Sequence, residues 1–263
     1  MDGFIKLSNF SKVAPYMSMF KEGLMVTILM SLFTVMIGFV LALILAMMRM
    51  SNVCPFRALG LDKNGRLRDG GFLLALSRFN PLSFLATAYV ELLRSTPIIV
   101  QIFIIYYGVF GVIDLPKITV LGFIKFDRFF PGVVALGMNS GAYLCEIIRS
   151  GLQSVDGGQT EASRSLGLSA SQTMRFIILP QAIKVTLPAM GNEFVAIIKE
   201  SSILYAVGVY ELTYQAYKLA SVNYFYIETL IVAALIYFVL TYAATGLLKL
   251  LERRMRRGDN KVV

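Results

Sequence analysis

The side chains best suited to chemistry in this chain are a few charged and amide groups that interrupt long apolar stretches. Arg94 and Glu146 carry opposite charges, and Asn192 stands next to Glu193. Such groups are costly inside a membrane and usually mark a transport pathway, a pairing or a packing contact. An arginine and a glutamate could together hold a ligand that carries both charges. Alternatively, they could pair with each other, or with Glu91 and Glu193, and only hold the structure together.

Several of these polar side chains are predicted to lie at the same depth in the membrane. With a rise of 1.5 Å per residue, Arg94, Glu146 and the Asn192-Glu193 pair fall in one layer, roughly 10–15 Å from the inferred cytoplasmic boundary. Other polar groups lie nearer the opposite side. We therefore predict six candidate ligand-binding residues: Arg94, Gln101, Glu146, Asn192, Lys199 and Ser202.

The residue types that are absent exclude several kinds of chemistry. The chain has no histidine, which removes histidine-based acid–base catalysis and histidine metal sites. It also lacks the G-x-x-x-x-G-K-[ST] sequence that cradles nucleotide phosphates. Cys54 falls in a charged loop and Cys145 in an apolar stretch, so no disulfide is expected. We predict no catalytic residue, no metal and no cofactor bound by this chain.

The elements that must position the candidate residues are transmembrane helices. Apolar residues make up 57% of the 263, and four uncharged stretches approach the roughly 17–25 residues that a helix needs to cross a bilayer. A fifth apolar stretch carries four charged residues. Pro97 and Pro188 are expected to kink the second and fourth spans. We predict an all-α integral membrane protein with about five spans, at residues 23–49, 84–113, 130–153, 184–208 and 226–250.

The distribution of lysine and arginine predicts the orientation of these spans. Basic residues cluster after the first span and after the last, and such clusters normally mark the cytoplasmic side. The net charge of +9 therefore indicates topology rather than nucleic-acid binding. A multi-pass protein of the cell (inner or plasma) membrane follows, with its N-terminus outside and its C-terminus in the cytoplasm.

The remaining segments are assigned from their composition. Residues 1–22 are expected to lie at the outer interface, and the apolar run that follows is too long for a cleaved signal peptide. Residues 23–252 form the membrane domain, and residues 253–263 form a basic cytoplasmic tail. Asn64-Gly65 predicts a tight turn or small hairpin in the loop at 51–80.

A mixed-polarity segment at residues 156–180 follows the third span. Gly157-Gly158 interrupts the helix, and "QTEASRSLGL" predicts a short helix that ends at Gly167. "SASQTMRFIILPQA" then opens with a helix cap and precedes Pro180. Two short helices joined by a glycine turn would form a compact cytoplasmic projection. On periodicity alone, an ordinary loop at the membrane interface is an alternative.

The spacing in this segment closely resembles the EAA loop of ABC importer permeases. Where that family reads EAA, then Gly, then I-x-L-P, this chain has Glu161-Ala162-Ser163, Gly167 and Ile177-x-Leu179-Pro180, with Ser163 in place of an alanine. "YVELLRSTPIIVQIFIIYYG", "GAYLCEIIRSGLQSV" and "GNEFVAIIKESSIL" are similar to the polar amino-acid branch. The resemblance covers about residues 21–254, although the loop at 51–80 is longer than is usual in the family.

The resemblance implies a type I ABC importer permease fold, in which residues 156–180 form a coupling helix that docks on a separate ATPase. Docking would involve Glu161, Ala162, Ser163, Gly167, Ile177, Leu179 and Pro180. The implied partners are ABC ATPase subunits that bind the ATP, a second permease copy or a sister permease, an extracytoplasmic amino-acid-binding protein and the lipid bilayer. The substrate would be a polar amino acid, whose two charges Arg94 and Glu146 could satisfy.

Two other functions compete with this one. A stand-alone secondary transporter or channel would not need the EAA-like projection, and co-isolation with an ATPase would argue against it. An intramembrane enzyme would need histidines, a metal-ligand cluster or paired intramembrane aspartates, which this sequence lacks. Five spans also enclose too little for a full pathway, which favours a permease dimer.

Overall fold

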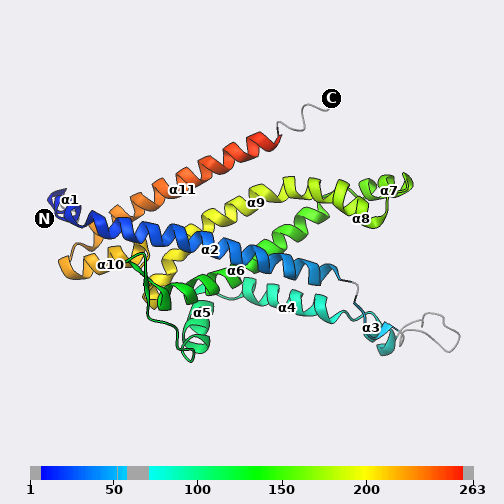
Figure 1. The fold of residues 1–263 in the computed structure, drawn as a ribbon, viewed down its shortest axis with the longest axis horizontal. Helices are drawn as coiled ribbons and strands as arrows, with labels where there is room; N and C mark the ends of the chain where they lie inside the picture. Colours follow the sequence, from blue (N-terminus) through cyan, green and yellow to red (C-terminus); the bar gives the residue numbers. More distant parts are fainter. Residues whose placement is uncertain (1–6, 52, 58–70, 257–263) are drawn as a thin grey trace.

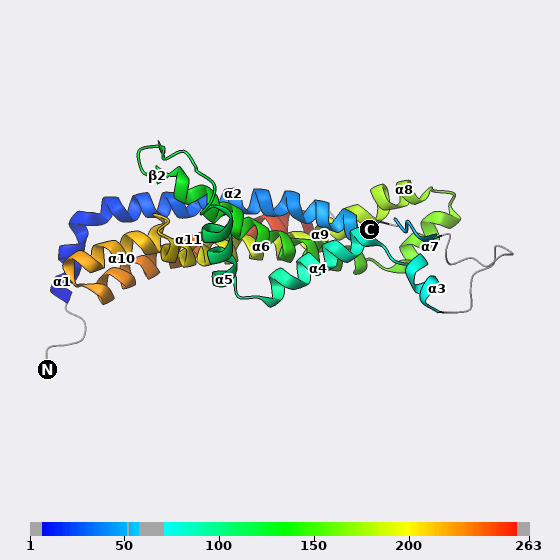
Figure 2. The same cartoon turned by 90° about the horizontal axis from the view of Figure 1, so that it is seen from below.

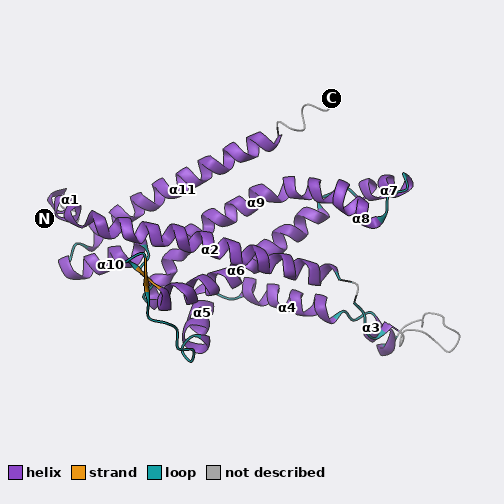
Figure 3. Cartoon of the chain, in the orientation of Figure 1, coloured by secondary structure: helices purple, strands orange, loops and turns teal. Residues whose placement is uncertain are grey.

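The computed structural model describes residues 7–51, 53–57 and 71–256, and helices dominate this part of the chain (Figures 1 and 3). The longest helices run along the long axis of the molecule, and Figure 2 shows that they form an elongated bundle. α1 and α10 lie at one end of the bundle, and α7 and α8 lie at the opposite end (Figure 1). The all-α fold class is confirmed, apart from one small hairpin.

The elements follow one another along the chain with short connections. Their bounds are α1 Leu7–Val13, η1 Ala14–Tyr16, α2 Met17–Met50, α3 Phe72–Ser77, α4 Pro81–Ser95, α5 Ile98–Phe103, η3 Ile104–Val109, β1 Thr119–Val120, β2 Ile124–Lys125, α6 Phe126–Gln153, α7 Gly157–Ser165, α8 Ala170–Thr173, η4 Met174–Ile178, α9 Leu179–Glu200, η5 Ser201–Val207, α10 Leu212–Asn223 and α11 Tyr226–Arg256. η1 and η5 are 3₁₀-helical, and η3 and η4 are π-helical. β1 and β2 pair antiparallel, with Thr119 opposite Lys125.

α2 and α6 form the central pair of the bundle, and α4 and α9 pack against them. Glycines bring the central pair close together, as small residues do between membrane helices. A Cβ atom added at Gly137 would lie 3.0 Å from the Ile37 side chain, and one added at Gly141 would lie 2.8 Å from Leu41. Larger residues at these two positions would push α2 and α6 apart.

A buried carboxylate connects the N-terminus of α10 with the body of α11. Glu211 is fully buried and caps the N-terminus of α10, where it accepts hydrogen bonds from the backbone N–H groups of Thr213 at 2.8 Å and Tyr214 at 2.6 Å. The Tyr237 hydroxyl of α11 donates to the same carboxylate at 2.8 Å. Helix N-termini favour such negative groups.

The number of membrane spans stays a prediction. By length and composition, two helices of the described chain could cross a membrane, Asn9–Met50 and Tyr226–Met255. A third candidate exists only if Pro81–Ser95 and Ile98–Val109 are counted as one span, although they meet at 111°. The chain does bend at Pro97, as expected, but the bend is a break between two helices rather than a kink within one.

Other boundaries also differ from the predicted ones. α2 begins at Met17, so part of the expected lead-in at 1–22 belongs to the first long helix. α10 was not predicted as a helix, and the outer loop contains the β1–β2 hairpin. The turn expected at Asn64-Gly65 and the end of the tail at 257–263 lie outside the described residues.

Candidate functional site

The segment at 156–180 forms two short helices, α7 and α8, that project from one end of the bundle (Figure 2). The Asp156 side chain caps α7 by accepting from the Gly158 N–H at 2.6 Å. Gly167 turns the chain with φ at +85°, a conformation that favours glycine. Ser169 and Gln172 form a reciprocal capping box at the start of α8. Local sequence signals therefore determine this structure.

Ser163 joins the two short helices. It is 4% exposed, and its hydroxyl lies 3.0 Å from the Thr160 carbonyl and 3.0 Å from the Thr173 hydroxyl of α8. The serine that replaces the family's alanine is thus the buried member of its triplet. Its hydroxyl connects the two short helices, and the contact with an ATPase that the resemblance implies stays a prediction.

The outer surface of the projection mixes apolar and charged side chains. Glu161 and Ala162 are exposed, Leu166 is 84% exposed and Phe176 is 60% exposed. The Arg175 guanidinium lies 5.6 Å from the centre of the Phe176 ring. Leu166 and Phe176 are thus large apolar side chains that no other described segment of the chain covers.

The projection continues directly into a bundle helix. The chain stays helical from α8 through η4 into α9, and α9 begins at Leu179 and Pro180. Ile177 is half-buried, whereas Leu179 and Pro180 are exposed. These three residues of the I-x-L-P motif therefore lie at the junction between the projection and the bundle.

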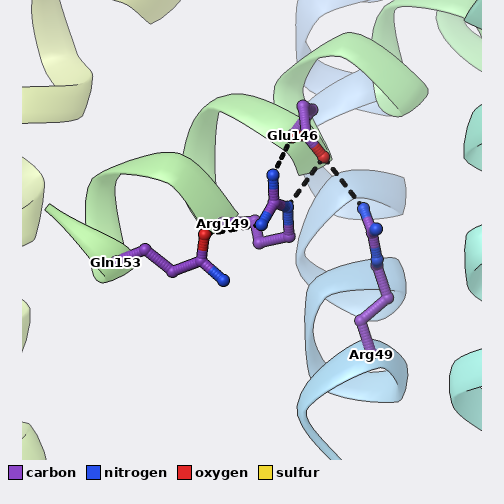
Figure 4. A network of polar contacts seen from close by, with 4 residues as sticks. All are labelled: Arg49, Glu146, Arg149 and Gln153. Carbon is purple, nitrogen blue, oxygen red and sulfur yellow. Dashed lines mark hydrogen bonds and ion pairs between the residues drawn. The ribbon is translucent and has the colours of Figure 1, made fainter.

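Glu146 lies in an ion-pair network near the C-terminal ends of α2 and α6 (Figure 4). Its Oε2 accepts from Arg49 Nη1 of α2 at 2.9 Å and from Arg149 Nε at 2.9 Å, and its Oε1 accepts from Arg149 Nη2. Arg149 also donates to Gln153. The sequence left open an ion pair between Glu146 and Arg94. The structure corrects this, because Glu146 pairs with Arg49 and Arg149 instead.

A cavity of about 360 Å³ adjoins this network, between α4, α6 and α9. Arg94 of α4, Tyr143, Glu146 and Ser150 of α6, and Thr186 of α9 all line it. The Arg94 guanidinium lies over the Tyr143 ring, 5.6 Å from its centre, a distance at which a cation is attracted to an aromatic face. The structure thus brings Arg94 and Glu146 to one cavity without pairing them.

Gln101 holds the break between α4 and α5. It is 6% exposed, and its Nε2 lies 2.7 Å from the Leu93 carbonyl and 3.0 Å from the Thr96 carbonyl. Its Oε1 accepts from Asn139 of α6 at 2.9 Å. Gln101 therefore bonds two backbone carbonyls at the break, where helical hydrogen bonds are interrupted, and it shares the Leu93 carbonyl with Asn139, which donates to it at 3.3 Å.

The other candidates lie apart from the cavity of Arg94 and Glu146. Asn192 is exposed on α9, Ser202 is half-buried in η5, and Lys199 lines a groove between α9 and α11. Arg49, Arg149 and Tyr143 were missed. The spacing of Glu146 and Arg149 at i,i+3 on one helix was the signal that could have revealed the second of these.

The described residues offer no sign of a metal centre. Within residues 7–51, 53–57 and 71–256, no group of three or more cysteine or carboxylate side chains is placed to hold an ion.

Comparisons with known proteins place the chain among transport proteins. Residues 70–257 match the family described as binding-protein-dependent transport system inner membrane component. The arginine transport system permease protein ArtQ of Bacillus subtilis (strain 168) is 34% identical over 251 residues, which cover 95% of this chain and 99% of ArtQ. The probable glutamine ABC transporter permease protein GlnM of the same organism is 35% identical over 250 residues, which cover 95% of this chain and 99% of GlnM.

Solved structures agree with these relatives. A chain from the crystal structure of an amino acid ABC transporter with histidines aligns with a TM-score of 0.76 and 38% identity, covering 93% of this chain and 98% of that one. A chain of the inward-facing MetNI methionine ABC transporter has a TM-score of 0.66 at 19% identity, covering 92% of this chain and 98% of that one, which shows the fold alone. From the family match and the near-complete coverage of its relatives, we conclude that this chain belongs to the binding-protein-dependent transport system inner membrane components.

Proposed function

We propose that this chain is the membrane-spanning permease subunit of an ABC importer for polar amino acids. It acts as a transport permease rather than as an enzyme, and a separate ATPase subunit binds and hydrolyses the ATP. The observation that carries the proposal is the projection formed by α7 and α8, which is internally braced and continuous with α9. Because α9 also lines the cavity of Arg94, a partner on the projection can act on that cavity.

The ATPase binds the exposed surface of the projection in this proposal. Leu166 and Phe176 supply the apolar contacts, and Glu161 and Arg175 supply charges at the edge. Ser163 and Gly167 shape the surface without contributing large side chains to it. Apolar anchors surrounded by charged groups are the usual composition of a protein–protein contact.

The cavity of about 360 Å³ is the substrate site that we propose. An arginine can bind a carboxylate through two parallel hydrogen bonds, so we assign Arg94 to the substrate carboxylate. The Ser150 and Thr186 hydroxyls can accept from the substrate ammonium. Glu146 already holds Arg49 and Arg149, so its main role in this proposal is to shape the cavity wall.

The remaining partners follow from the names of the relatives and from the charge pattern. An extracytoplasmic binding protein delivers the amino acid to the outer face, near the β1–β2 hairpin. Two permease chains, either identical or sisters, enclose the pathway between them. The N-terminus then lies outside, and the projection lies in the cytoplasm. Movement of the ATPases alternates access to the cavity.

Two exposed leucines, one on the projection and one in the β1–β2 hairpin, provide a matched test of docking. Leu166→Asp should abolish co-purification of the ATPase and substrate-stimulated ATP hydrolysis, because it places a charge in the centre of an apolar contact. Leu121→Asp, at a leucine that is 68% exposed in the outer hairpin, should leave both at the level of the unmodified protein. Normal docking by Leu166→Asp would show that the projection is not the ATPase contact.

The substrate assignment is tested by uptake of a panel of labelled amino acids. Arg94→Gln should raise the KM for uptake by about tenfold or more, because a hydrogen bond to a charged group contributes about 1.5–3 kcal/mol. Arg94→Lys, which keeps the charge, should retain part of the affinity. An unchanged KM in both variants would remove Arg94 from the site, whichever amino acid is transported.

A further inference from the structure

A second cavity lies between the bundle and the projection. It has a volume of about 260 Å³ and is enclosed by the inner ends of α2 and α6 together with α7 and η4. Arg49 and Arg149 line it, with the Gln153 amide and the Thr160 hydroxyl as further polar groups. The rest of its wall is apolar and includes Met174. The proposed substrate cavity lies elsewhere and shares none of these residues.

The charge on this second cavity is one-sided. Two guanidinium groups line it, and none of the described residues that line it is a carboxylate. Glu146 lies outside the lining and pairs with both arginines, through Nη1 of Arg49 and through Nε and Nη2 of Arg149. One carboxylate balances only one of the two guanidinium charges, so one positive charge is left uncompensated. A guanidinium carries five N–H donors, so Arg49 retains donors beyond this contact. The Arg49 side chain is only 16% exposed, and a further anion is favoured where a positive charge is held so far from water.

The groups on this wall fit the phosphodiester of a phospholipid. A phosphodiester carries one negative charge, which matches the positive charge that Glu146 leaves uncompensated on the two arginines. Its two non-esterified oxygens can accept from the free donors of Arg49, from the Gln153 amide and from the Thr160 hydroxyl. Arginine is also the side chain that is preferred for binding phosphate. The apolar part of the wall suits the carbon atoms that join a phosphate to a lipid.

The position of the cavity indicates where such a phosphate comes from. Arg49 lies in the last turn of α2, at the end of a helix that can span the membrane. Met50 lines the cavity and is 50% exposed. Met47, one turn earlier in α2, is 65% exposed, and Ile44, two turns earlier, is 46% exposed. The cavity therefore adjoins an exposed apolar strip of α2, as expected where a headgroup site continues into a surface for acyl chains.

We propose that this cavity binds the phosphate of an anionic phospholipid from the cytoplasmic leaflet. Basic pockets between helices on that side of a membrane are suited to such headgroups. The bound phosphate contacts Arg49 and Arg149 on the bundle side and Thr160 on the projection side, so it strengthens the connection between them. The inference rests on the proposed function for its orientation, but the lipid site itself does not depend on which substrate is carried.

Gln153→Glu is the variant that tests this site most directly. Arg149 already donates to the Gln153 side-chain oxygen, so a glutamate keeps that contact and adds a negative charge to the wall. Both arginines and their pairing with Glu146 remain. Gln181→Glu adds the same charge at an exposed position outside the cavity and serves as the charge control, although it also removes the hydrogen bond that the Gln181 amide donates to the Ile177 carbonyl at 2.9 Å.

The experiment uses the full chain with its co-purifying ATPase in nanodiscs. One set contains phosphatidylcholine alone, a second adds phosphatidylglycerol, and a third contains phosphatidylcholine with inorganic phosphate in the buffer. Native mass spectrometry counts the phosphatidylglycerol retained by the permease, and ATP hydrolysis is measured in parallel. The lipid count needs no transport, so it remains informative if the proposed substrate is wrong.

The expected result is that the unmodified chain and Gln181→Glu retain phosphatidylglycerol, whereas Gln153→Glu binds it about fivefold more weakly, the effect of one charge near the membrane surface. Phosphatidylglycerol should also stimulate ATP hydrolysis in the first two proteins. Equal retention by all three proteins would overturn the site. Equal loss in both variants would assign the effect to general surface charge and would also overturn it. Full stimulation by inorganic phosphate alone would overturn the lipid as the source of the phosphate.

Discussion

The ion pairs of Glu146 make a quantitative prediction possible. Glu146→Gln removes the carboxylate and leaves two guanidinium groups near each other. Arg49 and Glu146 are only 16% and 19% exposed, so this pair is close to the buried case, in which breaking one partner costs about 3–5 kcal/mol. Arg149 is 35% exposed, and its pair contributes about 0.5 kcal/mol. Because some water reaches Arg49, we expect a cost at the lower end of the range of about 3–5 kcal/mol. The total loss of folding free energy should therefore be about 3 kcal/mol.

Two double-mutant cycles test which arginine is the partner. The first combines Glu146→Gln with Arg49→Gln, and the second combines it with Arg94→Gln. Residues in contact show coupling, whereas independent residues are nearly additive. The first cycle should give a coupling energy of about 2–3 kcal/mol, and the second should give less than about 0.5 kcal/mol. Glu146→Asp serves as a control that keeps the charge.

The measurement is unfolding of the purified permease in detergent. A loss of about 3 kcal/mol corresponds to a melting temperature lower by about 6–12 °C in a chain of this size. Double substitution of Glu146 and Arg49 should recover part of that loss, because no charge is then left without its partner. Strong coupling to Arg94 together with additivity at Arg49 would refute the assignment of the network.

Three further predictions concern other parts of the chain. Gln101→Leu should lower the melting temperature by about 2–12 °C, because it removes the hydrogen bonds of the buried Gln101 amide with Asn139 and with the Leu93 and Thr96 carbonyls, a loss of about 1–3 kcal/mol in total; an unchanged value would mean that the α4–α5 break needs no such support. Gly167→Ala should cost about 1 kcal/mol through its positive φ and should speed amide exchange in α7, whereas Gly167→Asn should do so less; equal exchange in both would contradict the role of the turn. In a background without native cysteines, Lys117→Cys should react with an impermeant thiol reagent on intact cells and Ala170→Cys should not, and the reverse pattern would overturn the orientation.

The projection was the part that the sequence predicted best. The glycine turn at Gly167 and the cap at Ser169 act within a few residues of themselves, so their signals are readable without the fold. The break after Ser95 was harder, because an uncharged stretch from Ser95 to Ile113 has the composition of a single span. Proline before Gln101 indicated a bend but could not show its size, which depends on the contact of Gln101 with Asn139 in α6.

The candidate cavity could be predicted only in part. Counting residues along a helix gives the depth of Glu146, but not the direction in which it points around the helix axis. That direction decides whether Arg94 of α4 or Arg49 of α2 becomes its partner, and Arg49 is 97 positions away in the chain. α10 was missed because its sequence is of mixed polarity, although Glu211 stands at its start as a capping residue.

The helical path from Ala170 to Glu200 is unbroken, so it can act as a lever between the projection and the bundle. We propose that an ATPase binds at the α8 end of this path. Residues of α9, further along the same path, form a wall of the proposed substrate cavity. A stiff rod transmits displacement with little loss, while a flexible joint would absorb it as local bending. The wide π-helical turns of η4 are where such bending would occur. The stiffness of η4 would therefore determine how much of an ATPase movement is transmitted along α9 to the substrate cavity.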